Sequence, residues 1–454
     1  MKDLPELHHD ARAIFGAALR AVDAGAAVRH AVRLDGSILT TVASAIDLAA
    51  HGSGVYVIAI GKAAPAMAAA IDNILNNTIS GGIISGPITP ERELEAPGAF
   101  AADRWRFFAG GHPLPNQDSL NAARAAFDLL KRADVERAPV LFLVSGGGSA
   151  MIEWPSDNGI SLDELSEANR LLVACGASIG EVNAVRRAFS AIKGGGFARV
   201  APNSSQITLI ISDTNSGDEA SVASGPTIEP TLNVPDAKAV VARYADLADL
   251  PASVFNAINS AQPRTELPEA DRTLRKHYVL LDNQTAIKAA ADAARLLGFE
   301  TEIADDIVEQ PIAEGAALLR SRLKALRART NSSQPVCLVS GGEFRCPVRG
   351  NGRGGRNSET VLRWAIEIDR RSGEGNNGRI VALSAGTDGI DGNSPAAGAI
   401  ADQDTIARAL ALGLDVRTFL EESNSFGFFD KVSDTIVTGS TGTNVRDVRI
   451  LLGH

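Results

Sequence analysis

The stretch VSGGEFRCPVRGNGRGGRNSE, residues Val339–Glu359, joins a predicted buried strand to a predicted helix through a loop of glycines and arginines. The apolar run Val336–Val339 predicts the strand, and Asn357–Glu359 suit the N-terminal cap of a helix over Thr360–Asp369. Glycines let a backbone approach a ligand closely, and the planar guanidinium groups of arginines match phosphate or carboxylate oxygens. Because a helix N-terminus also favours anions, we predict an anion-binding loop here, with a solvated surface loop as the alternative.

The same arrangement of an apolar strand followed by a small-residue turn recurs along the chain. The segments are LFLVSGGGSA from Leu141, VCLVSGGEFR from Val336 and VALSAGTDG from Val381. They follow no fixed period, so they do not indicate a repeat protein. In open α/β sheets, ligands bind outside the carboxyl ends of the strands. The pattern therefore predicts an α/β fold in which these turns line one ligand cleft.

Composition limits the class of protein. The chain has 454 residues, 45% of them hydrophobic, which suits two or three domains with sizeable cores. Its net charge of -10 argues against nucleic acid or an anionic membrane as the main partner. Cys175, Cys337 and Cys346 lack the spacing of a disulfide framework or a metal site. The sequence shows neither a signal-peptide core nor a run of about 18 apolar residues, so we expect a cytoplasmic protein without membrane spans.

Two glycine turns carry candidate phosphate-binding groups. The apolar run Val55–Ile60 predicts a strand that leads through Gly61 and Lys62 into a helix over Ala63–Leu75. Lys62 could reach a phosphate, or it could be an exposed lysine on the first helical turn; the GxxxxGK[ST] spacing of a P-loop is absent. The turn Ser145–Ser149 presents successive backbone N–H groups to an anion, with a tight strand–helix turn as the alternative.

Two polar segments complete the set of candidate groups. Lys193 and Gly194 form a basic glycine cluster that suits a phosphate, although a helix C-cap would use the same residues. The strand predicted over Gln206–Ile211 is followed by the acidic run Asp213–Glu219. Such acids can hold Mg²⁺ through water, or they can cap the next helix. Glycine turns, cations and clustered acids together are the inventory that phosphoryl transfer needs.

Two other functions stay open from the residues alone. An oxidoreductase that uses NAD(P)H should carry a dinucleotide fingerprint after its first strand, where this chain has Gly61-Lys62-Ala63-Ala64. The literal match Gly350-x-Gly352-x-x-Gly355 follows Cys346–Arg349, whose proline makes a poor central strand, so we discount it. A non-catalytic sensor of sugar acids or nucleotides would not need this many lysines, arginines and acids in its turns.

The turns quoted so far are parts of longer blocks that resemble one known family, the class II glycerate kinases, which are glycerate 2-kinases with a C-terminal MOFRL domain. The resemblance covers nearly the whole chain. The blocks that carry it are AIGKAA (Ala59–Ala64), AGGHPLPN (Ala109–Asn116), VSGGGSA (Val144–Ala150), VNAVRRAFSAIKGG (Val182–Gly195), SGP (Ser224–Pro226), SGGE (Ser340–Glu343), GRGGRN (Gly352–Asn357), SAGTDGIDG (Ser384–Gly392) and TGTNV (Thr441–Val445).

The resemblance implies ATP-dependent phosphorylation of D-glycerate at O2, giving 2-phosphoglycerate and ADP, with Mg²⁺. Members of the family often carry an older label, hydroxypyruvate reductase, which is the alternative activity. The residues alone leave open the choice between O2 and O3, and whether the protein is a homodimer.

The implied fold is α/β, with a Rossmann-like three-layer N-terminal domain, a smaller α/β MOFRL domain and the active site in the cleft between them. We therefore predict an N-terminal domain over residues 1–265 and a MOFRL-containing domain over residues 266–435. The C-terminal segment, residues 436–454, could return to the first domain.

The resemblance also implies roles for residues, position by position. Lys62 matches the family's lysine in GKAA and Arg353 matches the arginine of GRGGRN, both implied in catalysis. Asp388 is a third catalytic candidate, which would orient or deprotonate the glycerate hydroxyl. The remaining candidates are Ser145, Gly146, Gly147, Gly148, Ser149, Lys193 and Gly194 for the phosphates of ATP, Arg187, Glu343, Arg356 and Asn357 for glycerate, and Asp213 and Asp218 for Mg²⁺.

The sequence departs from the family pattern in four places, one of which is the acidic loop Asp213–Glu219, which lacks the family's usual sequence. Ser358 stands where glutamine is usual after GRGGRN, and Ser394-Pro395 replaces threonine-aspartate before AAGA. Arg446 stands where asparagine is usual in TGTNVND. These departures bear on nucleotide or metal binding more than on the class of reaction.

Overall fold

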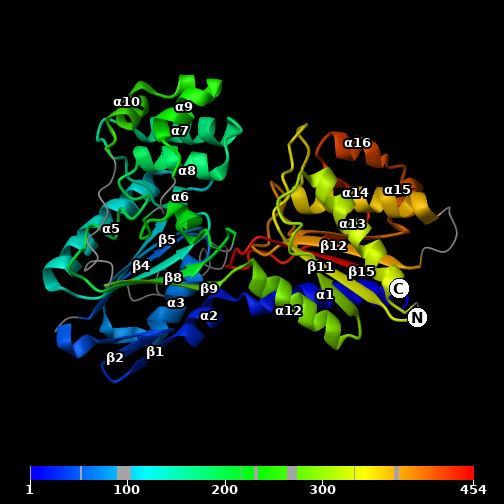
Figure 1. The fold of residues 1–454 in the computed structure, drawn as a ribbon, viewed down its shortest axis with the longest axis horizontal. Coiled ribbons are helices and arrows are strands. Elements are labelled where there is room, and N and C mark those ends of the chain that lie inside the picture. The colour runs from blue at the N-terminus through cyan, green and yellow to red at the C-terminus, as the bar shows by residue number, and fades with distance from the viewer. Residues whose placement is uncertain are drawn as a thin grey trace. The chain divides into compact units, whose positions relative to one another are not determined.

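The computed structural model describes residues 2–51, 54–88, 104–215, 217–229, 234–262, 274–331, 333–372 and 378–454. The chain forms two compact units: a first unit, Ala24–Leu281, and a second unit that joins Met1–Asp23 to Asp282–His454 (Figure 1). The sequence also predicts a turn over Gly373–Gly378 and a passage between domains over Thr231–Arg275. Residues 373–377 and part of this passage lie outside the described residues.

The first unit is built on a parallel sheet whose strands are β4 (Val55–Ile60), β5 (Ile79–Gly86), β6 (Trp105–Ala109), β7 (Val140–Ser145), β8 (Gln206–Ile211) and β9 (Arg275–Leu281). Their order in the sheet is β6-β5-β4-β7-β8-β9. The order in which strands are added to the sheet reverses between β4 and β7, as in dinucleotide-binding folds, and in open α/β sheets ligands bind at the carboxyl ends of the strands at such a point. Both strands are apolar and buried along their whole length, as the centre of a parallel sheet requires.

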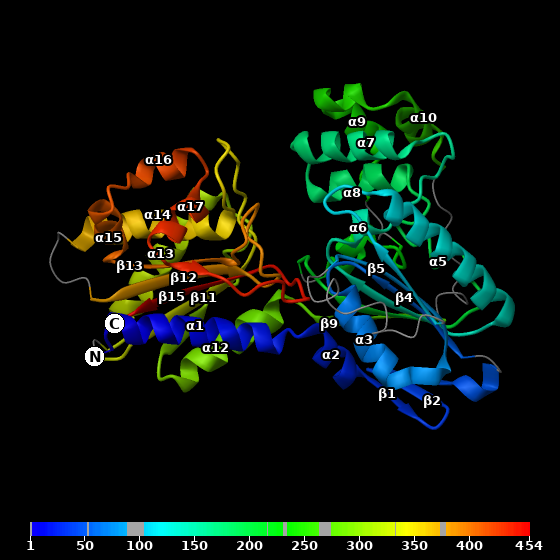
Figure 2. The ribbon, with the colours of Figure 1, turned by 180° about the vertical axis from the view of Figure 1, so that it is seen from behind.

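Helices on both faces of this sheet give three layers. α2 (Ala24–Ala31) and α3 (Ala64–Leu75) lie on one face, and α5 (Gln117–Glu136) lies on the other (Figures 1 and 2). Ala122 and Ala126 of α5 belong to the core on that face, where small side chains let the helix approach the strands closely. The predicted Rossmann-like three-layer fold of this unit is confirmed.

A lobe of helices with its own apolar core completes the first unit. It consists of α7 (Leu162–Ala174), α8 (Ile179–Ala188), α9 (Ala237–Arg243), η4 (Ala245–Asp249) and α10 (Ala252–Ser260). The unit also contains an antiparallel meander that the sequence analysis did not predict: β1 (Val32–Asp35), β2 (Ile38–Thr41) and β3 (Ser44–Asp47). Short helical turns connect these elements: η1 (Leu48–His51), η2 (Asn76–Thr78), α6 (Gly148–Met151) and η3 (Glu219–Ser224).

The second unit has a mixed sheet of β10 (Glu300–Ile303), β11 (Val336–Gly342), β15 (Asp447–Gly453), β12 (Ile380–Gly386), β13 (Gly398–Asp402) and β14 (Thr435–Ile436), in this spatial order. Among the described strands of this sheet, only the pair β10–β11 is parallel. On one face lie α1 (Leu4–Ala21) and α12 (Asn283–Leu296), and on the other lie α13 (Ile312–Arg329) and α14 (Arg356–Ser372) (Figure 1). α15 (Thr405–Ala411), α16 (Val416–Glu421) and α17 (Ser425–Lys431) pack against α14.

The division into units differs from the predicted one at three places. The N-terminal helix α1 packs on α12, β12 and β15, so it belongs to the second unit. β9 pairs with β8, which extends the first unit to Leu281 rather than to residue 265. The C-terminal segment does not return to the first unit, because β15 lies between β11 and β12 in the second sheet. These pairings join residues far apart in the chain, so local sequence patterns did not indicate them.

Among the described residues, the helices are too short or too polar to cross a membrane.

Candidate active site

The turns after β4 and β7 are joined at the point where the strand order reverses. The Lys62 amide donates to the carbonyl oxygen of Gly146 at 2.9 Å, and the Ala63 amide donates to Ser145 Oγ at 3.0 Å. Ser145 Oγ in turn donates to the carbonyl oxygen of Ile60 at 3.2 Å, and the side chain is fully buried. The hydroxyl of Ser145 therefore holds the two turns together instead of facing a ligand, which corrects its predicted role.

Side chains from three other turns surround the glycines that follow β7. A Cβ atom built on Gly146 would lie 2.0 Å from Asp213 Oδ2, so the Asp213 carboxylate rests directly on this glycine. Gly147 has a left-handed φ of 79°, and a Cβ there would meet Lys62 Cγ and His112 Cδ2, both at 3.2 Å. Glycine is therefore required at both positions, and the turn gathers Lys62, Asp213 and His112 around itself.

Lys193 lies beneath this turn. Its side chain is 1% exposed, forms an ion pair with Glu153 and donates to the carbonyl oxygen of Ser149 at 2.9 Å. Burial lowers the pKa of Lys193, although the charge of Glu153 acts in the opposite direction. The prediction that Lys193 contacts phosphate directly does not fit this position. The amide of Gly194, its neighbour, donates to the carbonyl oxygen of Ser224 at 3.0 Å.

The acidic run after β8 separates into two environments. Asp213 rests on the glycine turn, whereas Asp218 is exposed and accepts a hydrogen bond from Ser221 Oγ at 2.8 Å. Burial lowers the pKa of Arg187 on α8, and the nearby charge of Asp218 opposes that shift. The charges of Asp218 and Arg187 are therefore close enough to interact. In the described part of the chain, no group of three or more His, Cys, Asp and Glu side chains is arranged to hold a metal ion.

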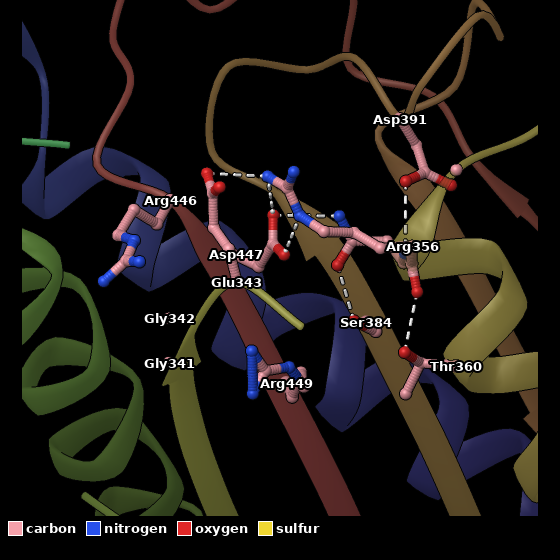
Figure 3. Close-up of polar contacts among 12 residues, drawn as sticks. Gly341, Gly342, Glu343, Arg356, Thr360, Ser384, Asp391, Arg446, Asp447 and Arg449 are labelled. Atoms are coloured by element: carbon pink, nitrogen blue, oxygen red, sulfur yellow. Dashed lines mark hydrogen bonds and ion pairs between the residues drawn. The ribbon is translucent and has the colours of Figure 1, made fainter. Parts of the chain in front are cut away.

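In the second unit, Arg356 is held by two carboxylates. It forms a bidentate pair with Asp447, with Nε to Oδ2 at 2.6 Å and Nη2 to Oδ1 at 3.1 Å, and Nη2 lies 2.7 Å from Glu343 Oε1 (Figure 3). Burial would lower the pKa of Arg356, but the charges of Asp447 and Glu343 raise it above its ordinary value. Burial likewise would raise the pKa of Asp447, yet Arg356 holds it below its ordinary value. The predicted glycerate ligands Arg356 and Glu343 thus bind each other.

The N-terminus of α14 is occupied by a carboxylate of the protein. Asp391 is 1% exposed and accepts hydrogen bonds from the amides of Asn357 and Ser358 at 2.9 and 2.8 Å. Ser358 Oγ also donates to it at 2.5 Å. The helix begins at Arg356, so Asn357 and Ser358 lie in its first turn and Asp391 acts as the cap from outside. The prediction of an anion site at this helix N-terminus is wrong, because Asp391 already fills it.

Of the other predicted residues of the second unit, Arg353 and Asp388 lie on loops and Asn357 lies in the first turn of α14. Arg353 is exposed, and its guanidinium carbon lies 4.9 Å from the centre of the Phe426 ring. Asp388 follows β12 and accepts a hydrogen bond from the Ile390 amide at 3.1 Å. Asn357 Nδ2 donates to Asp447 Oδ1 at 2.9 Å, and Asn357 Oδ1 accepts from Ser384 Oγ at 2.6 Å, so its side chain belongs to the Arg356 cluster rather than to a ligand contact.

Sequence reasoning missed Asp391 and Asp447. Asp391 stands in the quoted block SAGTDGIDG, so its position was visible, but its partners in α14 were not. Asp447 comes two residues after the block TGTNV, at the start of the unpredicted strand β15. The signal that could have found them is the arginine-rich loop itself, because arginines packed against a buried sheet need carboxylates as partners.

Comparisons with known proteins identify the family of this chain. Residues 10–259 match the domain of unknown function DUF4147, and residues 336–447 match the MOFRL family. The chain belongs to the glycerate kinase family that combines these two domains. It is 33% identical over 447 residues to the glycerate 2-kinase of Pyrococcus horikoshii, covering 97% of this chain and 96% of that one.

Two further relatives define the range of names in the family. A protein of Agrobacterium vitis, provisionally named a hydroxypyruvate reductase, is 33% identical over 399 residues, covering 87% of this chain and 98% of that one. The crystal structure of the glycerate kinase of Thermotoga maritima superposes with a TM-score of 0.78 at 29% identity, covering 99% of both chains. The predicted family resemblance is confirmed.

Proposed function

We propose that this protein is a glycerate 2-kinase, which transfers the γ-phosphoryl group of ATP to the O2 hydroxyl of D-glycerate and releases 2-phosphoglycerate and ADP. The observation that carries the proposal is the packing of Lys62 and Asp213 on the glycine turn Gly146–Gly148, at the reversal point of the parallel sheet. A cation, a carboxylate and a close-approach backbone at one point are what phosphoryl transfer requires.

Each of these groups has a role in the proposed reaction. The backbone of Gly147 and Gly148 would lie against the phosphates. A side chain on Gly147 would crowd Lys62 and His112, and one on Gly148 would collide with Ala223 and Ile60, so glycines keep this turn in place. Lys62 would neutralise charge that develops on the transferring phosphoryl group. Asp213 fits Mg²⁺, because this ion takes one or two carboxylates and completes its shell with phosphate oxygens and water. The ion would supply positive charge to those oxygens. Asp218 fits less well, since it is exposed and already accepts a hydrogen bond from Ser221 Oγ.

Fewer residues remain as candidates for binding glycerate than the sequence suggested. Arg187 stays our candidate for the carboxylate of glycerate in the first unit. In the second unit, Arg353 and Asp388 remain the proposed catalytic residues on exposed loops. Arg356, Glu343 and Asn357 form a closed hydrogen-bonded cluster with Asp447, and we assign them to support of the loop that carries Arg353. The location of the active site between the two units stays a prediction.

A coupled assay tests the proposal. Purified protein is mixed with ATP, Mg²⁺ and D-glycerate, and the products are passed to enolase in the absence of phosphoglycerate mutase. ADP together with phosphoenolpyruvate would support kinase activity with O2 as the acceptor. ADP without phosphoenolpyruvate would move the acceptor to O3 or to another hydroxyl.

The reductase alternative has one observation in its favour, since the strand order of the first sheet is that of dinucleotide-binding folds. Against it, the first strand–helix turn of the sheet reads Gly61-Lys62-Ala63-Ala64 and lacks the glycine fingerprint. Oxidation of NADH on hydroxypyruvate, with no ADP formed in the kinase assay, would reverse the choice.

A further inference from the structure

We propose that Ser224 is a positioning residue, which holds the glycine turn after β7 in place through Ser149. This inference rests on the proposed kinase function, because the turn is where the phosphates of ATP would bind. Ser224 lies at the end of η3, far from the turn in sequence, and its block, SGP, has no role in the site described so far.

A chain of side-chain hydrogen bonds leads from the turn into the helical lobe. Ser149 Oγ lies 2.9 Å from Ser224 Oγ, and Ser224 Oγ donates to Asn183 Oδ1 at 2.9 Å. Ser224 and Asn183 are both 2% exposed, so water does not compete for these contacts. Because the proton of Ser224 goes to Asn183, Ser149 is the donor in the contact between the two serines. The orientation of the Ser149 hydroxyl is therefore fixed from α8.

The backbone around Ser224 is held in an unusual conformation. Ala223, Ser224 and Gly225 are all left-handed, with φ of 50°, 60° and 66°. This conformation is unfavourable for residues with a Cβ and persists only where the surroundings impose it. Here the Gly194 and Gly195 amides donate to the carbonyl oxygens of Ser224 and Gly225 at 3.0 and 2.7 Å.

This left-handed backbone places Ala223 and Ser224 against the glycine turn that follows β7. A Cβ atom on Gly148 would lie 2.8 Å from Ala223 Cβ, so the strained segment touches the turn itself. A right-handed backbone at these positions would point the Ser224 hydroxyl elsewhere. We infer that the strain is retained because it aims this hydroxyl at Ser149.

A second buried contact holds Ser149, this time through its carbonyl group. Lys193 Nζ, paired with Glu153, donates to the carbonyl oxygen of Ser149 at 2.9 Å. Both the hydroxyl and the carbonyl group of Ser149 are thus fixed by buried partners. Gly147 and Gly148, which precede it, are the residues that Lys62 and Ala223 contact. Loosening Ser149 should therefore displace the proposed phosphate cradle without moving the rest of the unit.

The test compares Ser224→Ala with Ser224→Gly. Both remove the hydroxyl, but glycine tolerates the left-handed backbone, so it separates lost hydrogen bonding from backbone strain. We expect both variants to lower kcat and raise the KM for ATP by about tenfold or more, since small displacements of positioned groups cost that much. The KM for D-glycerate should stay within about twofold of the parent value. Ser253→Ala is the control, because Ser253 Oγ binds Glu164 in the helical lobe, away from the turn.

Three results would overturn the proposal. One is an unchanged kcat and KM for ATP in both variants. Another is full activity of Ser224→Gly with loss only in Ser224→Ala, which would make the backbone, and not the hydroxyl, the important feature. The third is a double variant, Ser149→Ala with Ser224→Ala, in which the losses of activity of the two single variants add. Two residues that act through one hydrogen bond should give a smaller loss than the sum. Ser149→Ala alone also tests the contact if Ser224→Ala fails to fold.

Hydrogen exchange separates this proposal from the function on which it rests. In the parent protein without ligand, the amides of residues 146–150 should exchange more slowly than in Ser224→Gly, by about fivefold or more for one lost hydrogen bond. If the parent protein shows no kinase activity but the exchange difference appears, the proposed function fails and the positioning role stands. Equal exchange together with kinase activity in the parent would reject only the role of Ser224.

Discussion

Lys62 is the residue on which the proposed chemistry depends most. Its side chain lies on Gly147, next to the glycine on which Asp213 rests, so it is placed to meet the charge of a phosphoryl group bound at this turn. Lys62→Ala should lower kcat by roughly 100- to 1,000-fold, which is the usual effect of removing one aligned electrostatic group. Steady-state kinetics with ATP and D-glycerate would measure it, and thermal unfolding should show an unchanged midpoint. Lys131→Ala, an exposed lysine on α5, is the matched control. Ordinary turnover of Lys62→Ala would remove this residue from the mechanism.

Gly146 offers a test of Asp213 that leaves the carboxylate in the chain. A methyl group on Gly146 would lie 2.0 Å from Asp213 Oδ2, so Gly146→Ala must displace the carboxylate. We expect the Mg²⁺ concentration for half-maximal activity to rise about tenfold or more, as it does when a ligand's support is removed. Activity measured across a magnesium titration gives this value. Gly180→Ala is the control, since a Cβ there meets nothing within 4 Å. The same magnesium dependence in both variants would separate Asp213 from the metal.

Single residues also show what sequence patterns leave out. Lys62 and the glycine turn after β7 were found from local spacing, because a strand, a glycine and a cation lie next to one another in the chain. Lys193 and Arg356 carry the same type of charge, but Glu153 and Asp447 neutralise them. Glu153 is 40 residues from Lys193 and Asp447 is 91 residues from Arg356. A cation that looks available in sequence can therefore be bound within the fold.

At the scale of elements, strands made of apolar runs next to glycines could be predicted from the sequence, whereas a strand that contains charged residues could not. β4 and β8 have the predicted bounds, β7 lies one residue later than the predicted range Pro139–Val144, and β11 extends beyond the predicted Val339 to Gly342. β15 was missed because Asp447 and Arg449 interrupt its apolar pattern, although the whole strand is buried. Arg449 donates to Ser340 Oγ at 3.0 Å and lies over the Phe344 ring, and burial lowers its pKa to about 9. Such neighbours make a buried charge tolerable, and only the fold supplies them.

The attachment of α1 to the second sheet depends on pH through one carboxylate. His8 Nε2 lies 2.7 Å from Asp402 Oδ2, and Arg408 pairs with the same carboxylate. Burial would raise the pKa of Asp402, but His8 and Arg408 outweigh it and lower the pKa to about 2. A carboxylate with a lowered pKa in the folded state stabilises the protein above its unfolded pKa, near 4, and loses that contribution as the pH falls towards 2.

Asp402→Asn should therefore reduce the free energy of unfolding of the second unit by about 2 kcal/mol at pH 6, which corresponds to the lowering of the pKa. The difference between variant and parent should shrink as the pH falls from 4 to 2. Urea unfolding at several pH values would measure it. Asp292→Asn, an exposed carboxylate on α12, is the control. A difference that stays constant down to pH 2 would mean that Asp402 acts through packing alone.

At the scale of the whole molecule, the second unit is made of two segments that lie far apart in the sequence. The chain begins in the second unit with α1, forms the entire first unit from Ala24 to Leu281, and then returns to complete the second. The family matches cover residues 10–259 and 336–447, so neither match marks these boundaries. A helix of amphipathic composition can be predicted at the N-terminus, but the sheet that it covers is formed by β12 and β15, near the other end of the chain. No local pattern connects them.

This division predicts that the second unit cannot fold without α1. The helix buries Leu7, Ile14 and Phe15, which are 0%, 0% and 3% exposed. At about 1.5–3 kcal/mol for each large side chain, removing it should cost roughly 5–9 kcal/mol, which is comparable with the stability of a whole domain. A variant that begins at Asp23 should therefore lose the second unit and keep the first.

Calorimetry and limited proteolysis would test this prediction. The parent chain should resist protease in both units, whereas the shortened chain should be digested after residue 281 and leave the fragment Ala24–Leu281 intact. Ile14→Ala should give a graded version, with a loss of about 2–4 kcal/mol in the second unit alone. Arg12→Ala, which changes an exposed residue of the same helix, should leave both units unchanged.

If the shortened chain keeps a protease-resistant second unit, α1 is only an attachment and the compact unit begins at Asp282. Restoration of that resistance by a peptide of residues 2–23 would show that the helix acts through the contacts described here, because only those contacts are available to a separate peptide.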